Sequence, residues 1–126
     1  MLGGDHLSTL GWRNDLARAY RSVGRWAEAI PLFEQNLADS ERVLGGDHPS
    51  TLGRRNDLAD AYGSVGGRLA EAIPLFEQNL ADAERVLGGD DLFTLGWRNN
   101  LARAYAAAGR FAGDWTADGM AVPALA

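Results

Sequence analysis

Two amino acids are missing from this chain, and each absence narrows what the protein can be. It has no cysteine, which excludes disulfide bonds and thiolate metal sites. It has no lysine either, so its 12 positive charges are all arginines, set against 17 acidic side chains for a net charge of −5. Nucleic acid is therefore not expected as a partner, because phosphate binding needs a basic stripe.

Long hydrophobic runs are also absent. No apolar stretch approaches the roughly 18 residues of a membrane span, so no membrane partner is expected. The opening residues 1–6 lack the basic and apolar segments of a signal peptide, which makes the cytoplasm the expected location. What remains is a globular composition, 46% hydrophobic and 23% charged, in a length of 126 residues that fits one domain.

An internal repeat dominates the chain. The sequence Leu-Gly-Gly-Asp-His at residues 2–6 returns at 44–48, and again at 87–91 with aspartate in place of histidine, at offsets of 42 and 43 residues. The first two units align with a single gap at Gly66-Gly67 and differ at six other positions. We divide residues 1–126, a single repeat domain, into units 2–43 and 44–86, a truncated third unit 87–112, and a non-repeat tail 113–126.

The apolar residues within a unit follow a helical period, and no alternation of period two predicts a strand. One predicted stripe, on the first helix, is Trp12, Leu16, Ala19, Tyr20 and Val23. The stripe on the second helix is Trp26, Ala29, Ile30, Phe33 and Leu37. We expect helices at 7–23, 27–43, 49–65, 70–86 and 92–108, with Gly24-Arg25 as a break and Gly24 suited to a left-handed helix end.

The linker Leu-Gly-Gly-Asp-His invites two readings. As a helix start, it offers Asp5, Asp47, Ser8 and Ser50 as N-caps, and the sequence does not choose among them. As a metal site, it offers His6 and His48, but one histidine and one aspartate per loop are too few ligands, and the third loop lacks the histidine. We expect capping, with no metal and no cofactor.

Catalysis is not expected either. An active site needs an oriented third partner and a pocket, and it is usually single, whereas the Asp-His pair is copied with the repeat. The glycine-rich segment 63–67 lacks both the spacing and the lysine of a phosphate-binding loop. The aromatic stripes are expected in the core and not against a cofactor.

Three sets of residues in register resemble the tetratricopeptide repeat. They are Leu16, Ala17, Tyr20, Gly24, Trp26, Ala29 and Phe33 in the first unit; Leu58, Ala59, Tyr62, Ala72 and Phe76 in the second; and Leu101, Ala102, Tyr105, Gly109 and Phe111 in the third. The usual period of that family is 34 residues. The longer unit, with its Asp-His-Pro-x-Thr-Leu linker, is similar to the kinesin light chain variety.

The chain departs from the family pattern at two places. Arginine stands where the family often has an early tryptophan, at Arg13, Arg55 and Arg98, and Asn36 and Asn79 replace a small residue late in the second helix. The resemblance implies an all-α solenoid of antiparallel helix pairs, a right-handed superhelix of about two and a half repeats. It also implies a non-enzymatic scaffold whose concave face grips a peptide or helix of a partner protein.

The differences between units suggest where a partner binds. Arg18→Asp60 and Arg21→Gly63 lie three residues apart, so they share one helix face, and the resemblance places that face in the concave groove. The candidate partner-binding residues are Asn14, Arg18, Arg21, Asn56, Asp60, Asn99 and Arg103. Asn14, Asn56 and Asn99 would form a ladder of amides, and Arg18, Asp60 and Arg103 a plus–minus–plus row. The alternative is a solvated polar face with no function.

Self-association is the competing function. Trp12 and Trp97 occupy a position that holds Arg54 in the middle unit, and repeat arrays normally carry polar end faces. Residues 113–126 lose the apolar stripe, so we expect at most a short helix near 111–121 and partly bare Trp97, Leu101 and Tyr105. Apolar ends of this kind predict a homo-oligomer held near Trp97 or Trp12.

Overall fold

The described residues fold into five helices, which match the helices that the sequence predicts. A computed structural model describes residues 7–65 and 68–112, and within them every regular element is an α-helix. The helices are α1 (Leu7–Ser22), α2 (Trp26–Leu44), α3 (Pro49–Ser64), α4 (Leu69–Val86) and α5 (Leu92–Ala112). The predicted helices are confirmed to within one residue at every boundary except the end of α5, which runs on to Ala112. The prediction for the tail lies mostly outside the described residues.

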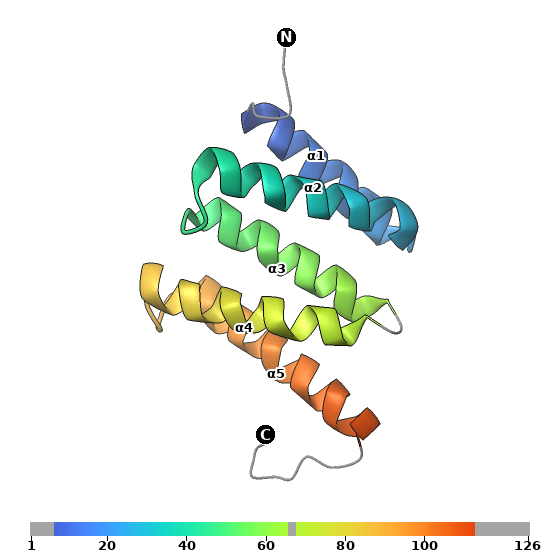
Figure 1. Cartoon of the computed structure of the whole chain (residues 1–126), viewed down its shortest axis with the longest axis vertical. Coiled ribbons are helices and arrows are strands. Elements are labelled where there is room, and N and C mark those ends of the chain that lie inside the picture. The colour runs from blue at the N-terminus through green and yellow to red at the C-terminus, as the bar shows by residue number, and fades with distance from the viewer. Residues whose placement is uncertain (1–6, 66–67, 113–126) are drawn as a thin grey trace.

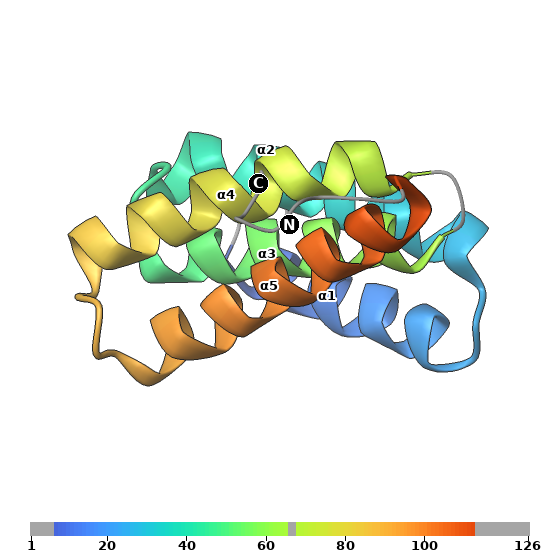
Figure 2. The ribbon, with the colours of Figure 1, turned by 90° about the horizontal axis from the view of Figure 1, so that it is seen from below.

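The helices pack in chain order and form two layers. Each helix contacts the next one along the chain, and α3 also contacts α5. Figures 1 and 2 show α2 and α4 in one layer and α1, α3 and α5 in the other. We call these the second-helix layer and the first-helix layer. Because each pair packs only on its neighbours, the core runs as a ribbon along an all-α solenoid, as predicted.

The helix starts resolve the capping question. His48 is the N-cap of α3, and its Nδ1 accepts a hydrogen bond from the Ser50 backbone N–H at 3.0 Å. In the third unit Asp91 takes the same place, and its Oδ1 accepts from the Phe93 N–H at 2.8 Å. Neither Asp47 nor Ser50 is the cap, and Asp47 pairs with Arg85 at 2.8 Å. Replacing histidine by aspartate therefore preserves the cap.

Glycine allows the sharp exit from α1, α2 and α4, where Gly24, Gly45 and Gly88 have positive φ. Gly24, between α1 and α2, has φ of +79°, which confirms the left-handed residue predicted there. Gly45, the first glycine of the linker after α2, has φ of +93°. Backbone geometry thus explains the first glycine of the repeated linker.

The second helices bury the side chains that the sequence predicted. Ala29, Ile30, Phe33 and Leu37 of α2 are buried, and Trp26 is partly buried against the same core. Their equivalents Ala72 and Phe76 of α4 are buried too. The apolar period of the second helix therefore identifies its core face correctly.

The stripe predicted for the first helix is wrong for α1. Leu16 is 48% exposed, and Trp12, Ala19 and Val23 are also exposed, while Leu10, Asn14 and Ala17 are buried. The reason lies in the stacking: the predicted stripe is the side of a first helix that meets the preceding unit. In α3 and α5 that side is covered, so Leu58 and Leu101, which correspond to Leu16, are only 5% and 8% exposed.

The other side of α1 and α3 packs mainly on the second helix of the same unit, α2 or α4, and shows the reverse pattern. Leu10 and Leu52 are fully buried there, whereas the corresponding Leu95 of α5 is 43% exposed. Leu92 and Phe93 are exposed as well. The described part of the stack thus ends in two different apolar faces, one on α1 and one on α5.

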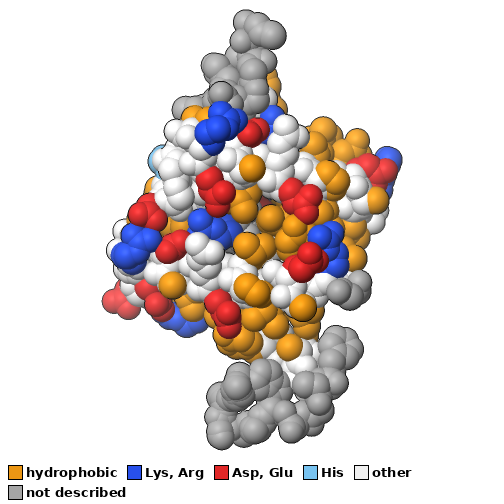
Figure 3. Space-filling model, viewed as in Figure 1, with side chains coloured by type: hydrophobic (Ala, Val, Ile, Leu, Met, Phe, Trp, Pro, Cys, Tyr) orange, Lys and Arg blue, Asp and Glu red, His pale blue; other side chains and the backbone are white. Residues whose placement is uncertain are grey.

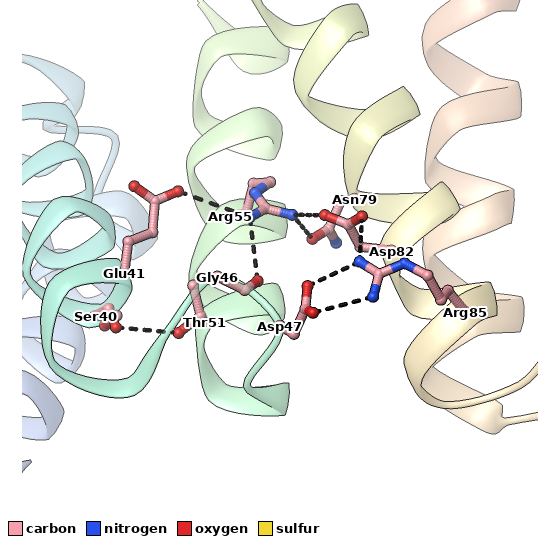
Figure 4. Close-up of polar contacts among 9 residues, drawn as sticks. All are labelled: Ser40, Glu41, Gly46, Asp47, Thr51, Arg55, Asn79, Asp82 and Arg85. Atoms are coloured by element: carbon pink, nitrogen blue, oxygen red, sulfur yellow. Dashed lines mark hydrogen bonds and ion pairs between the residues drawn. The ribbon is translucent and has the colours of Figure 1, made fainter.

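An arginine joins the two helices of each pair, and Figure 4 shows the one of the second pair, Arg55. Arg55 Nη1 of α3 donates to Asn79 Oδ1 at 3.4 Å and to Asp82 Oδ2 at 2.9 Å, both on α4. The first pair repeats this with Arg13, Asn36 and Asp39. The two departures from the family pattern therefore compensate each other, since the arginine replacing tryptophan binds the asparagine replacing a small residue.

The carboxylate of this cluster is held in its charged form. Burial alone would raise the pKa of Asp39, but hydrogen bonds from Arg42 and Arg13 outweigh it and hold the pKa below its usual value. Arg55 also donates to the Gly46 carbonyl at 3.4 Å, and its Nη2 lies 3.7 Å from Glu41 of α2. One guanidinium thus connects α2, the linker, α3 and α4.

Arg55→Ala should destabilise the protein far more than Arg98→Ala. The Arg55 side chain is 4% exposed, and its loss leaves the buried Asn79 Oδ1 without its donor and Asp82 with Arg85 alone among the described residues, which we expect to cost about 3 kcal/mol. Arg98, at the same position of α5, is 44% exposed and among the described residues pairs with Glu84 at 3.1 Å, so its loss should cost under about 1 kcal/mol. Urea unfolding measures both free energies, and equal losses would contradict the role given to the cluster.

Candidate protein-interaction surface

The charged residues predicted to bind a partner lie along the first-helix layer. Arg18 of α1 and Arg103 of α5 are exposed, and Asp60 of α3 between them is half-buried. Arg21 of α1 is half-buried, and its Nη1 lies 3.7 Å from Asp60 Oδ2. The plus–minus–plus row therefore spans three successive first helices, with one loose ion pair across the first seam.

The asparagines do not form a uniform ladder. Asn14 is buried, Asn56 is half-buried and Asn99 is exposed. Their position faces the next first helix, so Asn56 Oδ1 accepts a hydrogen bond from Asn100 Nδ2 of α5 at 3.3 Å. The Oδ1 atom of Asn14 is buried and has no partner among the described residues. These amides lie in the seams between first helices.

A hollow of about 160 Å³ lies where α3, α4 and α5 meet. It brings together Asp60 and Arg103, two of the predicted site residues, with Asn100, which the sequence did not single out. Gly63 also lines it, at the position where the first unit has Arg21, and leaves the space open. Leu69 and Phe76 contribute apolar surface, so the hollow offers both charges, an amide and a hydrophobic wall.

A second hollow, of about 260 Å³, lies between the starts of α3 and α5. Phe93 and Trp97 form one wall, with ring centroids 5.6 Å apart, and Pro49, Leu87 and Arg54 line the rest. The Arg54 Nε atom is buried and has no partner among the described residues. Trp97 is thus half-buried and lies beside Arg54, the residue that occupies the equivalent position in the second unit.

Asp57 is the most perturbed carboxyl of the first-helix layer. Burial raises its pKa, and Asp60 adds to this, while Arg18, Arg21 and Arg54 act in the opposite direction. Sequence reasoning missed this residue. The sequence could have pointed to Asp57, because the third unit has Asn100 at the corresponding position. This difference indicates that the fold does not need a charge there.

The residues predicted for self-association are placed differently from one another. Trp12 is exposed on α1, and Trp97 is half-buried. Leu101 is buried, so the expectation that it is bare is wrong, because it faces the covered side of α5. Tyr105 is half-buried, and its hydroxyl donates a short hydrogen bond to Glu77. The exposed apolar residues near Trp97 are Leu92, Phe93 and Leu95.

The second-helix layer presents a different surface. Figure 3 shows arginines and carboxylates interspersed over this face, with hydrophobic side chains gathered between them and no continuous patch of one sign. Close ion pairs account for this: Arg68 Nε lies 2.5 Å from Glu71 Oε1, and Arg25 Nη2 lies 2.9 Å from Glu28 Oε2. Charge on this face is locally balanced, unlike the loosely paired row of the first-helix layer.

Two expected absences can be checked over part of the chain. Among residues 7–65 and 68–112, no group of three or more histidines and carboxylates is arranged to hold a metal ion. No helix within the same ranges is both long and apolar enough to cross a membrane.

Asp57→Asn should stabilise the protein at neutral pH. The raised pKa means that the folded state favours the protonated carboxyl. The protonated carboxyl therefore contributes fully to the free energy of unfolding below the pKa of the unfolded state, which is about 4. This contribution is lost as the pH rises through the pKa of the folded state. Asparagine at position 57 removes the buried charge. It can also form a hydrogen bond with Asn14, in the way that Asn100 does with Asn56. Together we expect these changes to raise the free energy of unfolding by about 1 kcal/mol. Urea unfolding should show this gain at pH 7 and a smaller one at pH 4.

The matched control for that measurement is Asp60→Asn, one turn further along α3. It loses the pair with Arg21 and should bring no gain at either pH. A gain from both variants would show that net charge, and not the burial of Asp57, is responsible.

Comparison with known proteins supports the assignment that the repeat suggests. Two family models described as tetratricopeptide repeat match residues 9–50 and 66–112. No curated protein matches the chain. Among solved structures, the chain is similar to the TPR-like repeats of a Podosopora anserina protein described as a kinesin light chain, at 38% identity, 86% coverage of this chain and a TM-score of 0.73.

A point variant of the same repeats matches at 38% identity and a TM-score of 0.75, again over 86% of this chain. The chain spans about half, 51%, of the length of either structure. The two family matches together include most of α1 and all of α2, α4 and α5. The chain belongs to the tetratricopeptide repeat family, in its kinesin light chain-like form.

Proposed function

We propose that this chain is a non-enzymatic, cytoplasmic scaffold that binds a peptide or helix of a partner protein along its first-helix layer. Tetratricopeptide repeats generally mediate protein–protein interaction. The observation that carries the finer proposal is the hollow where Asp60, Asn100 and Arg103 converge beside Phe76. At about 160 Å³ it has room for one side chain of a partner.

The chemistry of the row suits a polypeptide. Arg103 offers a planar fork of donors for a carboxylate or a backbone carbonyl, and Asn100 can both donate and accept. Arg18 and Asp60 extend the surface across two more helices, so a bound segment would meet alternating charges. Such alternation sets the register and identity of a partner more than the affinity. The 3.7 Å separation of Arg21 and Asp60 leaves both groups able to exchange partners.

The test is peptide selection followed by titration. The chain is used to select binders from a random peptide library, and one synthetic binder is titrated calorimetrically against the wild type and against Asn56→Ala combined with Arg103→Glu. We expect at least about a tenfold loss, because a charge-assisted contact becomes a repulsion.

Arg98→Ala is the control, since Arg98 is another exposed arginine of α5 but pairs with Glu84 of the second-helix layer. It should bind as the wild type does. Unchanged binding by the Asn56 and Arg103 variant, with circular dichroism intact, would move the partner site away from this surface.

A second function, self-association, is favoured by the end of the described stack at α5. Leu92, Phe93 and Leu95 are exposed there, next to the Phe93–Trp97 ring pair. Exposed apolar groups that gather at one end favour pairing, and a two-fold dimer is the commonest arrangement. We propose a homodimer through this face at high concentration.

Phe93→Glu should abolish such a dimer, because it places a charge in the middle of the contact. Light scattering over a dilution series to hundreds of micromolar measures the mass. Val23→Glu, which changes an exposed valine on α1, should leave the dimer intact. A wild-type mass that stays monomeric throughout would rule out this second function.

A further inference from the structure

Each described junction between units is held by the same three polar side chains, a threonine, an arginine and a tyrosine. On α3, Thr51 Oγ1 donates to the Ser40 carbonyl at 3.3 Å, Arg55 Nη2 lies 3.7 Å from Glu41, and the Tyr62 hydroxyl donates to Glu34 at 2.5 Å. All three acceptors belong to α2. The donors therefore bind the second helix of the preceding unit.

The junction of α4 with α5 repeats the set. Thr94 Oγ1 donates to the Ala83 carbonyl at 3.5 Å, Arg98 Nη2 to Glu84 at 3.1 Å, and the Tyr105 hydroxyl to Glu77. At both junctions the two acceptor glutamates are seven residues apart, two turns along one helix face. The first glutamate of each pair contacts the tyrosine and the second contacts the arginine. Because the arginine precedes the tyrosine in the first helix, the first helix and the second helix of the preceding unit run antiparallel.

The pKa values of the two tyrosines show that their hydroxyls are shielded from solvent at these junctions. Burial, together with the hydrogen bond to Glu34, raises the pKa of Tyr62 to about 12, and Tyr105 is raised to about 12 by burial and Glu77. A junction thus combines a desolvated phenol with a carboxylate at a fixed place.

The first helix α1 carries the same donors. Thr9, Arg13 and Tyr20 stand at the positions of Thr51, Arg55 and Tyr62. Arg13 is engaged through Nη1 by Asn36 and Asp39, in the manner of Arg55 with Asn79 and Asp82. Within residues 7–65 and 68–112, however, no helix lies against this side of α1, and no carboxylate there accepts from Tyr20.

Apolar residues around these donors on α1 are the same as those that pack against the preceding unit on α3. Leu16 and Ala19 correspond to Leu58 and Ala61, which α3 buries against the preceding pair. On α1 both are exposed, together with Trp12 and Val23. The side of α1 therefore combines the apolar stripe and the polar donors that, at two other places in the molecule, are covered by a second helix.

We propose that this side of α1, through Thr9, Arg13, Leu16 and Tyr20, docks an amphipathic helix of another polypeptide that carries two glutamates seven residues apart on its apolar face. The first glutamate accepts from the Tyr20 hydroxyl and the second from Arg13 Nη2, and the helix lies antiparallel to α1. This site is separate from the row of Arg18, Asp60 and Arg103.

Among the described residues, no helix is free to supply this chemistry. Both second helices, α2 and α4, already use their glutamates at the internal junctions. The segment 113–126 contains no glutamate, and its two acidic residues, Asp114 and Asp118, are four apart. A second copy could supply a matching helix only by breaking one of its own pairs, so a partner whose helix is unpaired fits the site better.

The probe is a synthetic peptide of residues 26–44, the sequence of α2, titrated calorimetrically into the full chain. We expect one-to-one binding, weakened at least about tenfold by replacing both peptide glutamates with glutamine, because hydrogen bonds to a charged group are the stronger kind. Tyr20→Phe in the protein should weaken binding by a similar factor. Tyr62→Phe removes the equivalent hydroxyl inside the stack and should leave the affinity unchanged.

Leu16→Asp and Leu95→Asp form the matched pair that locates the site. Both leucines are about half exposed and lie on opposite ends of the described stack, so neither substitution should unfold the chain. Leu16→Asp should abolish binding and Leu95→Asp should not. The proposal is overturned if the peptide does not bind at about 1 mM or if both variants bind it equally. It is also overturned if the chain alone forms a dimer that Leu16→Asp converts to monomer, because a second copy would then be the occupant.

Discussion

The arrangement of the whole stack depends on a guanidinium buried between the helices of a pair. Arg55 reaches α4 through Asn79 and Asp82, the linker through the Gly46 carbonyl and α2 through Glu41. A buried charge is tolerated only when its donors are satisfied, so these segments must lie at one fixed distance and angle from α3. An apolar side chain in its place would fill space but would not demand four specific acceptors. The repeated arginine therefore sets geometry as well as stability.

The first helices are two-sided, and this explains much of the surface. One side carries donors and apolar groups for the preceding unit, and the other carries Leu10, Asn14 and Ala17 or their equivalents, which pack mainly on the second helix of the same unit. The charged row lies between the two sides. The units differ in charge there, at Arg18 and Asp60, whereas most positions of the two packed sides are the same in the first two units; Trp12 and Arg54 are the exception.

The sequence was sufficient for the helices, their pairing and the stacking order, because the repeat period and the apolar period report them directly. It was insufficient for burial in α1, since Leu16 and Leu58 are identical in sequence context and differ only in whether a helix lies over them. It could not show that Arg13 binds Asn36, because that contact crosses 23 residues between two helices. Nor could it choose His48 as the cap, which depends on the local direction of the chain at α3. Of the residues that line the hollow between α3, α4 and α5, it singled out Asp60 and Arg103 and missed Asn100; it also missed Asp57 of α3.

The near-identity of α2 and α4 bears on how the chain finds its fold. Over their shared length the two helices differ only at Trp26 and Leu69 and at Ser40 and Ala83, so each first helix meets chemically almost equivalent partners. Side-chain recognition alone can hardly tell the correct pair from an exchanged one. The choice falls to connectivity: residues 23–25 hold α1 beside α2, and closing so short a loop costs far less entropy than reaching α4. Lengthening that connection would make the two pairings compete during folding.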